Sequence, residues 1–377
     1  MRVAIVGPAF PYKGGGARHT TELAHRLAAA GHEVAIESWR AQYPGFLYPG
    51  QQTIDEPEGD PFPGTRHRLD WRRPDGWYRT GRALRSCDLV VLVVLSTVQV
   101  PSYLGILAGI KRGTTRTPGG VGGRPPSGSR VVALCHNVLP HERKPYDEPL
   151  MKRLLRKVDG VLVHTEAQAE VARGLTGRPV RVAEMAAHLP SSGTVPPGDA
   201  KVRRRLLFFG IVRPYKGLDV LLRALAEGPG DVSLTVAGEF WGGLDDTREL
   251  IRSLDLASRV ELRPGYVPAA DVAGLFAAAD ALVLPYRTAT ASQNVWMAYE
   301  HGLPVIATDV GGFAAQVRDG VDGLVCEPDD AASLAAALRR FYEPGEPERL
   351  RSGVRPVDHG PLWTAYVDAL TGAVRSP

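Results

Sequence analysis

Short apolar runs alternate with helical stretches through the first half of the chain. Each run has the length of a buried strand, and the runs cover residues 2–7, 33–37, 88–95, 131–135 and 160–164. Between the first two runs, residues 20–30 carry apolar positions at helical spacing and end at Gly31. This regular alternation of strand and helix predicts a doubly wound parallel sheet.

The alternation pauses and then restarts in the second half of the chain. Residues 190–200 are rich in Pro, Gly and Ser, which is typical of a linker between domains. The strands expected after it cover residues 205–210, 232–237, 260–262, 281–284, 304–307 and 323–325, and the helices cover residues 218–225, 247–254, 269–278, 295–301 and 333–342. The pattern predicts a second Rossmann-like domain, with a ligand cleft between the carboxyl ends of the two sets of strands.

Two segments interrupt this rhythm. Residues 50–80 are rich in Pro, Arg, Trp and Gly and have poor periodicity, while residues 112–130 form a Gly, Pro, Thr and Arg-rich stretch. Segments of this composition rarely form regular core elements. We interpret both as insertions outside the two sheets.

The composition agrees with two soluble domains. At 377 residues the chain is longer than one hydrophobic core usually supports. Hydrophobic residues make up 44% of it and charged residues 23%, which is ordinary for a globular protein and excludes a largely disordered one. The net charge of +4 is too small to identify a partner by itself.

Cysteine spacing and the absence of long apolar runs indicate a cytoplasmic protein. Cys87, Cys135 and Cys326 are far apart, which excludes a disulfide framework and a zinc motif. The longest apolar run, residues 89–95, is too short to span a bilayer, and the first residues read directly into a strand rather than a signal peptide. Residues 150–158 are basic and amphipathic, which suits either a membrane surface or a helix packed on the sheet.

One turn in the second half has the features of an anion site. The strand at residues 205–210 ends in Gly210, a short turn carries Arg213 and Lys216, and Gly217 opens an amphipathic helix. Helix N-termini present unpaired N–H groups and a partial positive charge, so two cations beside one favour a diphosphate or another polyanion. Ordinary solvated loop charges are the alternative, and the strand-glycine-turn-helix setting argues against it.

A second group of candidate residues follows strands of the first half. Gly14, Gly15 and Gly16 follow the first strand and permit close approach of a ligand to the backbone, or simply make a flexible turn. Their spacing is not that of a dinucleotide-binding loop, which disfavours a nicotinamide cofactor. His136 and Asn137 follow a later strand, so they project from the same sheet edge; the histidine is either a catalyst or a structural hydrogen-bonding group.

The order and spacing of the motifs along nearly the whole chain resemble those of one enzyme family. They are the glycine-rich first loop, Gly-His-Glu-Val at 31–34, His-Asn at 136–137, the Gly-x-x-Arg-x-x-Lys-Gly turn at 210–217, Ala-Gly-Glu at 237–239, Gly-Tyr-Val-Pro at 265–268, Pro-Tyr at 285–286, residues 302–307, the Gly pair at 311–312, and residues 320–325 with Asp329. The chain is similar to the family 4 (group 1) glycosyltransferases, whose GT-B fold has two Rossmann-like doubly wound domains facing a central cleft.

The resemblance implies a role for each matching residue. Arg213 and Lys216 would bind the diphosphate of the donor and stabilise it as the leaving group, and His136 would lie near the donor sugar. The other donor-binding positions implied are Gly210, Gly238, Glu239, Gly265, Tyr266 and Val267, the last three beside the base. Those implied on the acceptor or sugar side are Gly14, Gly15, Gly16 and Asn137.

The resemblance also implies the reaction and the division of labour. A sugar would pass from a nucleotide-diphosphate sugar to an acceptor hydroxyl with retention of anomeric configuration. Residues 1–189 would receive the acceptor, residues 201–361 would hold the donor, and residues 362–377 would pack back on the first domain. Fixed cations stabilise a leaving phosphate without a metal or cofactor, and we expect neither. The adjacent pair Asp245–Asp246 lacks the spacing of a metal-binding motif, and we expect it to cap a helix.

Two glutamates that the family usually carries are absent. Counting back from Gly302 places them at Ala289 and Met297, where they would hold hydroxyls of the donor sugar and of the ribose. The small and polar residues that could replace them are Thr290, Ser292, Gln293 and Asn294. Diphosphate capture can survive these changes, whereas sugar and ribose capture must differ.

Three functions are compatible with this departure. The first is an active transferase that uses the substitute residues. The second is a noncatalytic GT-B protein that binds a nucleotide or sugar and assists a partner. The third is another reaction on a nucleotide-sugar or sugar phosphate, such as phosphorolysis or hydrolytic epimerisation. Retention of Arg213, Lys216 and His136 favours the first.

The missing ribose-binding carboxylate suggests a hypothesis about the donor. Met297 stands in its place and cannot hold a ribose hydroxyl, which costs less binding for a deoxyribose donor such as a dTDP-sugar, because deoxyribose lacks one of those hydroxyls. Glu300 lies one turn later and can reach the ribose instead. The donor nucleotide is therefore expected to be of the UDP, GDP or dTDP type. The acceptor is expected to be a sugar, a lipid-linked group or a small molecule, with peripheral membrane contact open and no nucleic-acid partner.

Overall fold

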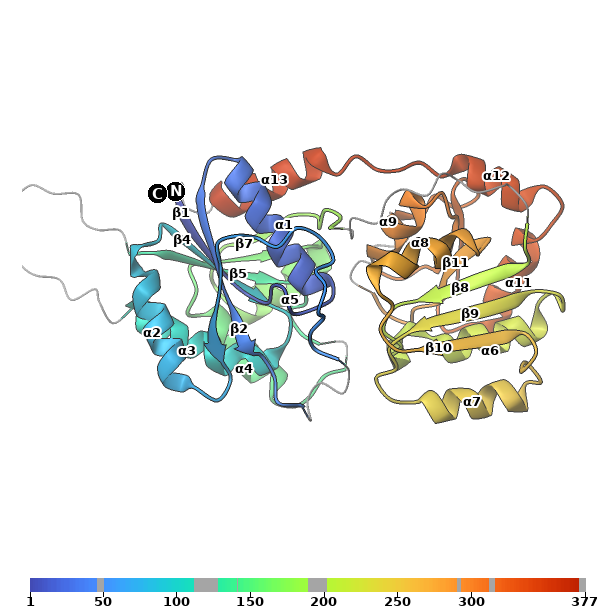
Figure 1. The fold of residues 1–377 in the computed structure, drawn as a ribbon, viewed down its shortest axis with the longest axis horizontal. Helices are drawn as coiled ribbons and strands as arrows, with labels where there is room; N and C mark the ends of the chain where they lie inside the picture. The colour runs from blue at the N-terminus through green and yellow to red at the C-terminus, as the bar shows by residue number, and fades with distance from the viewer. Residues whose placement is uncertain are drawn as a thin grey trace, which may run out of the picture. The chain divides into compact units, whose positions relative to one another are not determined.

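The structure is a computed structural model that describes residues 1–45, 51–111, 128–140, 142–188, 202–289, 293–311 and 316–372. It divides into two compact units, one formed by Met1–His188 with His359–Pro377 and the other by Leu189–Asp358 (Figure 1). The first unit therefore combines both ends of the sequence. The stretch expected to be the linker, residues 190–200, lies outside the described residues.

The N-terminal unit is built on a seven-stranded sheet whose paired strands are all parallel. Its strand order is β3-β2-β1-β4-β5-β6-β7. The strands are β1 (Arg2–Val6), β2 (Glu33–Ala41), β3 (Thr65–Asp70), β4 (Leu89–Val94), β5 (Arg130–Cys135), β6 (Gly160–Val163) and β7 (Val180–Val182). The strand order reverses between β1 and β4, and ligands of doubly wound sheets bind at the carboxyl ends beside such a reversal.

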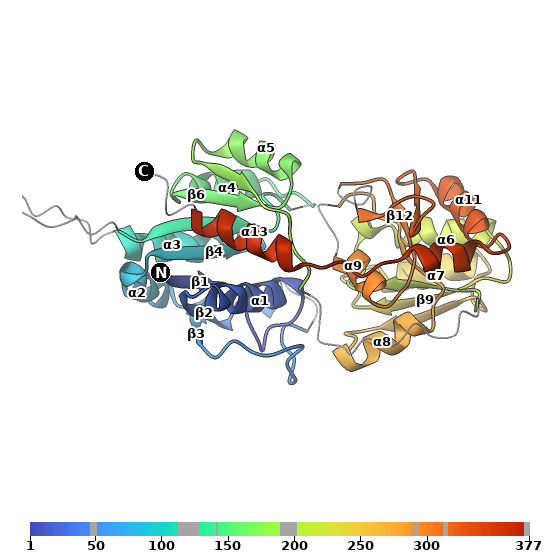
Figure 2. The same cartoon turned by 90° about the horizontal axis from the view of Figure 1, so that it is seen from above.

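Helices cover both faces of this sheet (Figures 1 and 2). They are α1 (Gly15–Ala29), α2 (Pro74–Ala83), α3 (Val100–Lys111), α4 (Asp147–Leu155), α5 (Glu166–Leu175) and α13 (Gly360–Thr371), with short 3-10 turns η2 (Leu84–Ser86) and η3 (Thr97–Gln99). Helix α13 comes from the end of the chain and contacts α1, seen beside it in Figure 2. No helix among the described residues is long and apolar enough to cross a membrane.

The interpretation of residues 50–80 as an irregular insertion was wrong. This stretch contains β3 and most of α2, and β3 pairs in parallel with β2 through two register shifts. Strand β3 forms one edge of the sheet, and Leu69 is its only buried apolar residue. An edge strand with this exposure has no continuous apolar run, so its pattern does not stand out in the sequence.

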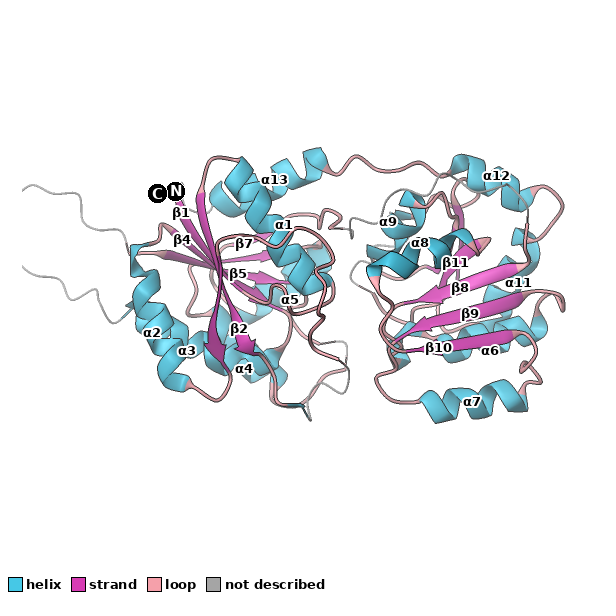
Figure 3. Cartoon of the chain, viewed as in Figure 1, coloured by secondary structure: helices cyan, strands magenta, loops and turns pink. Residues whose placement is uncertain are grey.

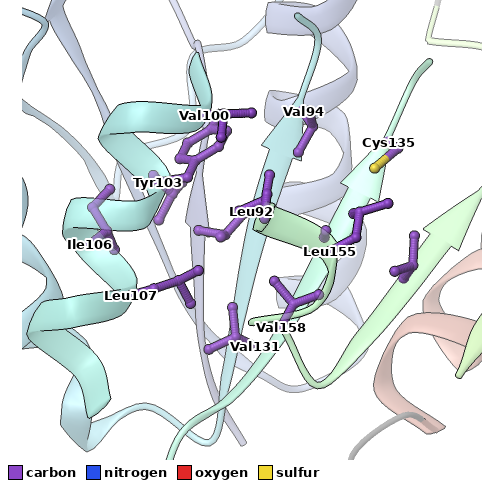
Figure 4. Packing of buried hydrophobic residues seen from close by; sticks show 14 of the residues in the cluster. Leu92, Val94, Val100, Tyr103, Ile106, Leu107, Val131, Cys135, Leu155 and Val158 are labelled. Carbon is purple, nitrogen blue, oxygen red and sulfur yellow. The ribbon is translucent and has the colours of Figure 1, made fainter. Parts of the chain in front are cut away.

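Alternating residues of β4 separate the core into two layers. Val90, Leu92 and Val94 belong to the cluster under α3, α4 and α5, and the close-up shows the side chains of α3 pointing into it (Figure 4). The other residues of the strand, Leu89, Val91 and Val93, pack with side chains of α1 and α13. A strand buried on both faces explains why residues 89–95 read as one continuous apolar run.

Helices α2 and α3 approach each other through two glycines. A Cβ atom on Gly81 would lie 2.1 Å from the carbonyl oxygen of Ile106, and one on Gly109 would lie 2.4 Å from the carbonyl oxygen of Tyr78. No side chain fits in this space. The two backbones can therefore pack at this distance only while both positions remain glycine.

The C-terminal unit carries a six-stranded parallel sheet of order β10-β9-β8-β11-β12-β13 (Figure 3). Its strands are β8 (Arg205–Phe209), β9 (Ser233–Gly238), β10 (Val260–Pro264), β11 (Ala281–Leu284), β12 (Val305–Thr308) and β13 (Gly323–Cys326). Its helical elements are η4 (Pro214–Lys216), α6 (Leu218–Glu227), α7 (Leu244–Ser253), α8 (Ala269–Ala277), α9 (Gln293–Glu300), α11 (Ala331–Phe341) and α12 (Glu346–Gly353). Here the strand order reverses between β8 and β11.

The predicted elements of the C-terminal unit agree closely with the observed ones. Helix α12 was not predicted from the sequence. In addition, the N-cap of α7 is Gly243, and the pair Asp245–Asp246 lies in the first turn instead of capping the helix. Carboxylates in a first turn still interact favourably with the positive end of the helix. The buried core joins β8, β9, β11 and β12 to the apolar faces of α6 and α11.

The glycine contact between α2 and α3 can be tested by substitution. We expect Gly81→Ala to lower the free energy of unfolding by about 2 kcal/mol, because the added methyl group forces the helices apart. The matched control is Gly174→Ala in α5, where a Cβ atom would have no neighbour within 4 Å. That change should leave stability unchanged or raise it by about 0.5–1 kcal/mol. Urea denaturation measures both, and equal effects would contradict the packing argument.

Candidate functional site

The turn after β8 combines two glycines in left-handed or unusual conformations. Gly210 has a φ of 100° and Gly217 a φ of 65°, values that side chains disfavour. A Cβ atom on Gly217 would lie 2.0 Å from the carbonyl oxygen of Pro285 at the end of β11. The turn is therefore held against the neighbouring strand at the point where the strand order reverses.

Lys216 is buried in this turn, with 9% of its surface exposed. Its Nζ atom lies 3.6 Å from where a Cβ atom of Gly210 would be, and the Nδ2 atom of Asn294 lies 3.5 Å from the same point. The ammonium group is 5.1 Å from the centre of the Tyr286 ring. Burial, together with the charge of Arg213, lowers the pKa of Lys216 below the usual value for lysine. Among the described residues, no carboxylate forms an ion pair with it.

Arg213 lies between two aromatic rings. Its guanidinium carbon is 5.1 Å from the ring centre of Trp241 and 6.0 Å from that of Tyr215. Two backbone hydrogen bonds hold Trp241 there: the N–H of Val212 donates to Glu239 at 2.7 Å, and the N–H of Trp241 donates to Val212 at 3.1 Å. Trp241 was missed by the sequence analysis, since only the contact across two loops reveals its position beside Arg213.

Glycine turns after three adjacent strands lie side by side at this edge. The N–H of Gly210 donates to Ala237 at 2.9 Å, and the N–H of Gly265 donates to Gly238 at 3.0 Å. A Cβ atom on Gly238 would lie 1.9 Å from the carbonyl oxygen of Gly210, so these turns pack backbone against backbone. Four of the donor-binding candidates, Gly238, Glu239, Gly265 and Tyr266, thus follow the strands next to the turn of Arg213 and Lys216, and Val267 is half-buried beyond them.

Helix α9 brings part of the polar turn to the same place. Asn294 lies in its first turn and donates through Nδ2 to the carbonyl oxygen of Phe209 at 3.0 Å, while Gln293 begins the helix. Two further candidates, Thr290 and Ser292, lie outside the described residues. Met297, at the position of a missing glutamate, is buried. Glu300 is half-buried, and burial raises the pKa of its carboxyl group.

A further charged residue, Arg287, follows β11 beside the turn. Its side chain forms ion pairs with Asp219 at 2.8 Å and with Asp329 at 2.7 Å. These bonds lower the pKa of Asp219 against the opposing effect of burial, and the bond to Asp219 raises the pKa of Arg287. The sequence offered one weak signal for this residue, namely an arginine just after the carboxyl end of a strand.

The glycine-rich loop of the N-terminal unit leads into α1. Gly14 is the N-cap of the helix with a φ of 88°, and Gly15 and Gly16 form its first turn. A Cβ atom on Gly16 would lie 2.6 Å from the Leu95 side chain, so the helix begins in close contact with the end of β4. These glycines thus serve close packing as well as access to the backbone.

Four histidines gather beneath this loop, and the sequence analysis had singled out only one of them. The ring of His19 lies 4.7 Å from that of His136, 5.1 Å from that of His188 and 5.9 Å from that of His164, measured between ring centres. His19 lies in α1, His136 and His164 directly follow β5 and β6, and His188 lies in the segment after β7. The N–H of His136 donates to the carbonyl oxygen of Val94 at 3.1 Å, which holds this residue at the end of β4.

Burial keeps the histidine cluster neutral. It lowers the pKa of His19, His136 and His188 well below the usual value, and it lowers that of His164 to about 4. Both ring nitrogens of His19 are buried without a hydrogen-bond partner among the described residues. Within the same part of the chain, no group of three or more His, Cys, Asp or Glu residues is arranged to hold a metal ion.

Two family models match the chain, one for each unit. A model of the group 1 glycosyl transferases matches residues 203–344, and a model of glycosyltransferase family 4 matches residues 13–184. Together the two matches cover well over half of the sequence. The chain belongs to the family 4 (group 1) glycosyltransferases.

Curated relatives match part of this glycosyltransferase. A protein named D-inositol 3-phosphate glycosyltransferase from Actinosynnema mirum is 30% identical over 254 residues, covering 60% of this chain and 60% of the relative. One of the same name from Nocardia farcinica is 35% identical over 175 residues, covering 43% of this chain and 38% of the relative. The matches to these two relatives thus span from 38% to 60% of their lengths.

Solved structures share the fold of this glycosyltransferase over nearly its whole length. Sucrose-phosphate synthase from Thermosynechococcus elongatus has a TM-score of 0.68 at 18% identity, covering 99% of this chain and 96% of that one. HepE from Anabaena, in complex with UDP and glucose, has a TM-score of 0.69 at 16% identity, covering 99% and 100%. At this identity the likeness shows the fold alone, and the fold is GT-B.

A cavity of about 670 Å³ in the glycosyltransferase lies away from the candidate residues. It sits at the starts of β5 and β6, and its lining includes Lys111, Arg130, Arg178 and Arg181. Lys111 and Arg178 donate to carbonyls just beyond the end of α4, and Arg181 donates to carbonyls at the end of α13. Cations at helix C-termini stabilise the helices, which explains Lys111, Arg178 and Arg181 without a ligand.

The histidine cluster should make the N-terminal unit acid-sensitive. Below about pH 6.5 an unfolded chain protonates its histidines, whereas the folded cluster resists protonation, so stability falls as the pH drops toward the lowered pKa values. Each histidine can contribute up to about 1.4 kcal/mol per pH unit in that window. Urea denaturation between about pH 7 and pH 5 measures the slope.

Removing one histidine from the cluster provides the control for this expectation. The variant His19→Gln should show a shallower loss of stability with acid than the wild type, whatever its stability at pH 7. The matched variant His67→Gln replaces an exposed histidine and should keep the wild-type slope. Identical slopes in all three proteins would contradict a role of the cluster.

Proposed function

We propose that this glycosyltransferase moves a sugar from a nucleotide-diphosphate sugar to an acceptor hydroxyl, with retention and without a metal. The observation that carries the proposal is the buried ammonium group of Lys216, which lacks a carboxylate partner among the described residues. A buried charge without a counter-charge is costly, and a bound diphosphate would supply the missing negative charge. Arg213 and the start of α6 add to the same positive region.

The proposed reaction divides between leaving group and acceptor. The bond from the anomeric carbon to the diphosphate oxygen breaks, and a bond from that carbon to the acceptor oxygen forms on the same face. The acceptor hydroxyl gives its proton to the departing phosphate. Negative charge grows on that phosphate as the bond breaks, and Lys216 and Arg213 stabilise the transition state there.

The neutral state of His136 limits its proposed role. Because burial lowers its pKa well below neutrality, its imidazole is a weak proton acceptor at physiological pH. We therefore propose that His136 and Asn137 orient donor sugar or acceptor by hydrogen bonds and do not act as a general base. Gly14, Gly15 and Gly16 present backbone at the same sheet edge for the acceptor.

Donor and acceptor classes follow from the relatives as first choices to test. HepE was solved with UDP and glucose, which supports trying UDP-sugars first, with GDP- and dTDP-sugars beside them. Relatives named for D-inositol 3-phosphate support a phosphorylated polyol as the first acceptor. The buried Met297 offers no hydrogen bond to a ribose hydroxyl, which keeps a dTDP donor among the candidates.

Removing the two cations of the turn should abolish transfer. We expect the double variant Arg213→Ala/Lys216→Ala to lose at least a thousandfold in kcat/KM, since it loses both charges that stabilise the leaving diphosphate. The assay follows release of nucleoside diphosphate from a panel of UDP-, GDP- and dTDP-sugars with sugar and phosphorylated polyol acceptors.

The control for the double variant is a substitution of an exposed arginine elsewhere in the same domain. Arg248→Ala removes an exposed cation of α7 that pairs with Asp245, and it should leave transfer unchanged. Retained activity in the double variant would contradict the proposed binding of the diphosphate by Arg213 and Lys216. Nucleotide binding by the wild type without release from any donor would instead favour the noncatalytic alternative.

The lowered pKa of Lys216 predicts a loss of activity in alkali. The protonated ammonium group binds the diphosphate, so kcat/KM should fall as the pH rises through the pKa of Lys216, which lies below the usual value for lysine. In Lys216→Arg the charge persists at all accessible pH values, so the alkaline limb should disappear even if the maximum is lower. The pH profile of kcat/KM with a saturating acceptor tests this. An unchanged alkaline limb in the variant would assign it to another group.

A further inference from the structure

Arg287 has an unusually complete set of partners around the turn that carries Arg213 and Lys216. Its Nη1 atom donates to the carbonyl oxygen of Pro214 at 2.7 Å and to Asp219 at 2.9 Å. Its Nη2 atom donates to the second oxygen of Asp219 at 2.8 Å. Its Nε atom donates to Asp329 at 2.7 Å. Four of the five N–H donors of the guanidinium group are therefore used within the protein.

The backbone of Arg287 adds a fifth bond to the same turn. Its N–H donates to the carbonyl oxygen of Tyr215 at 2.7 Å. Pro214 and Tyr215 are the two residues between Arg213 and Lys216, so both peptide carbonyls of the intervening segment are held by one residue. Because a trans peptide directs its N–H opposite to its C=O, this also turns the N–H of Tyr215 away from Arg287.

The partners of Arg287 come from three separate parts of the domain. Pro214 and Tyr215 lie in η4, Asp219 lies in the first turn of α6, and Asp329 immediately precedes the N-cap residue of α11. Arg287 itself follows β11, whose backbone also contacts Gly217 closely. One side chain therefore fixes η4 and α6 relative to the strand end at which the sheet order reverses.

These contacts leave Arg287 unsuited to bind the donor directly. Its charge is balanced by two carboxylates, and a guanidinium in a bidentate pair keeps its position and its planar orientation. Lys216, by contrast, faces an aromatic ring and forms no ion pair with a carboxylate among the described residues, and Arg213 lies beside two aromatic rings. The two kinds of cation in this site thus have different tasks.

We propose that Arg287 is a positioning residue that sets the spacing of the two donor-binding cations, and with it the preference for a diphosphate over a monophosphate. This inference rests on the proposed function. Two phosphates can be held together only if Arg213 and Lys216 keep a fixed separation, and the segment between them is the one that Arg287 fixes. A nucleoside monophosphate needs one of the cations and is less sensitive to their spacing.

Binding measurements on the full-length protein test the proposal. Calorimetry would determine the affinity for UDP, GDP and dTDP, and then for the monophosphate of the tightest of the three. In Arg287→Ala we expect affinity for the diphosphate to fall at least tenfold and affinity for the monophosphate to change less than threefold. Arg287→Lys cannot form the bidentate pair, and its affinity for the diphosphate should lie between those of Arg287→Ala and the wild type.

Two further variants keep the test decisive if Arg287→Ala folds poorly. Asp329→Asn removes one ionic partner of Arg287 and should lower the affinity for the diphosphate by a smaller factor than Arg287→Ala does. Arg318→Ala breaks a comparable ion pair with the buried Asp322 in the same domain and should lower the melting temperature without changing the diphosphate preference. An equal loss for monophosphate and diphosphate in Arg287→Ala and Asp329→Asn would indicate a structural role only and would overturn the proposal.

The outcomes separate this inference from the proposed function. Wild-type binding of a diphosphate together with an unchanged preference in Arg287→Ala and Asp329→Asn would overturn the inference and leave the transferase proposal intact. Failure of the wild type to bind any of the three diphosphates would overturn both, because Arg213 and Lys216 would then not form a diphosphate site.

Discussion

Close backbone packing of glycine turns is the constraint on which the C-terminal site depends. A Cβ atom on Gly238 would lie 1.9 Å from Gly210, and one on Gly217 would lie 2.0 Å from Pro285. The turns after β8, β9 and β11 therefore meet without side chains between them. This brings the Nζ atom of Lys216 and the Nδ2 atom of Asn294 to the same side of Gly210, within 3.6 Å and 3.5 Å of the point where its Cβ atom would lie. Parallel strands supply the common edge, and the glycines allow the loops to converge at it.

The cations around that backbone differ in whether carboxylates balance them. Arg287 is neutralised by Asp219 and Asp329 and holds the turn, whereas Lys216 is buried beside an aromatic ring without a carboxylate among the described residues. Burial of such a cation lowers its pKa and disfavours the charged form. Under the proposed function, a bound diphosphate would supply the negative charge that this buried cation lacks.

Local pattern was sufficient for the central strands of both sheets and for the turn at 210–217, because both depend on neighbouring residues. It was not sufficient where the partners are distant in sequence. The histidine cluster draws on four elements, and Arg287 bonds to Asp219 and Asp329, which lie far from it in the sequence. Edge strands β3 and β7 were missed for a different reason, because neither has the continuous buried apolar run by which the other strands were recognised.

Met297, which stands where the family usually has a second glutamate, is part of the apolar packing of α9. Its side chain is buried with Val295, Trp296, Ala298 and Tyr299, so α9 is held against the domain by apolar packing at this point. A buried thioether gives no hydrogen bond to a hydroxyl, and the Nδ2 group of Asn294 already bonds to the backbone of β8. Under the proposed function, polar recognition of the donor by this helix would fall to its first turn. More of the binding energy would then come from the diphosphate, and so from the fixed spacing of Arg213 and Lys216.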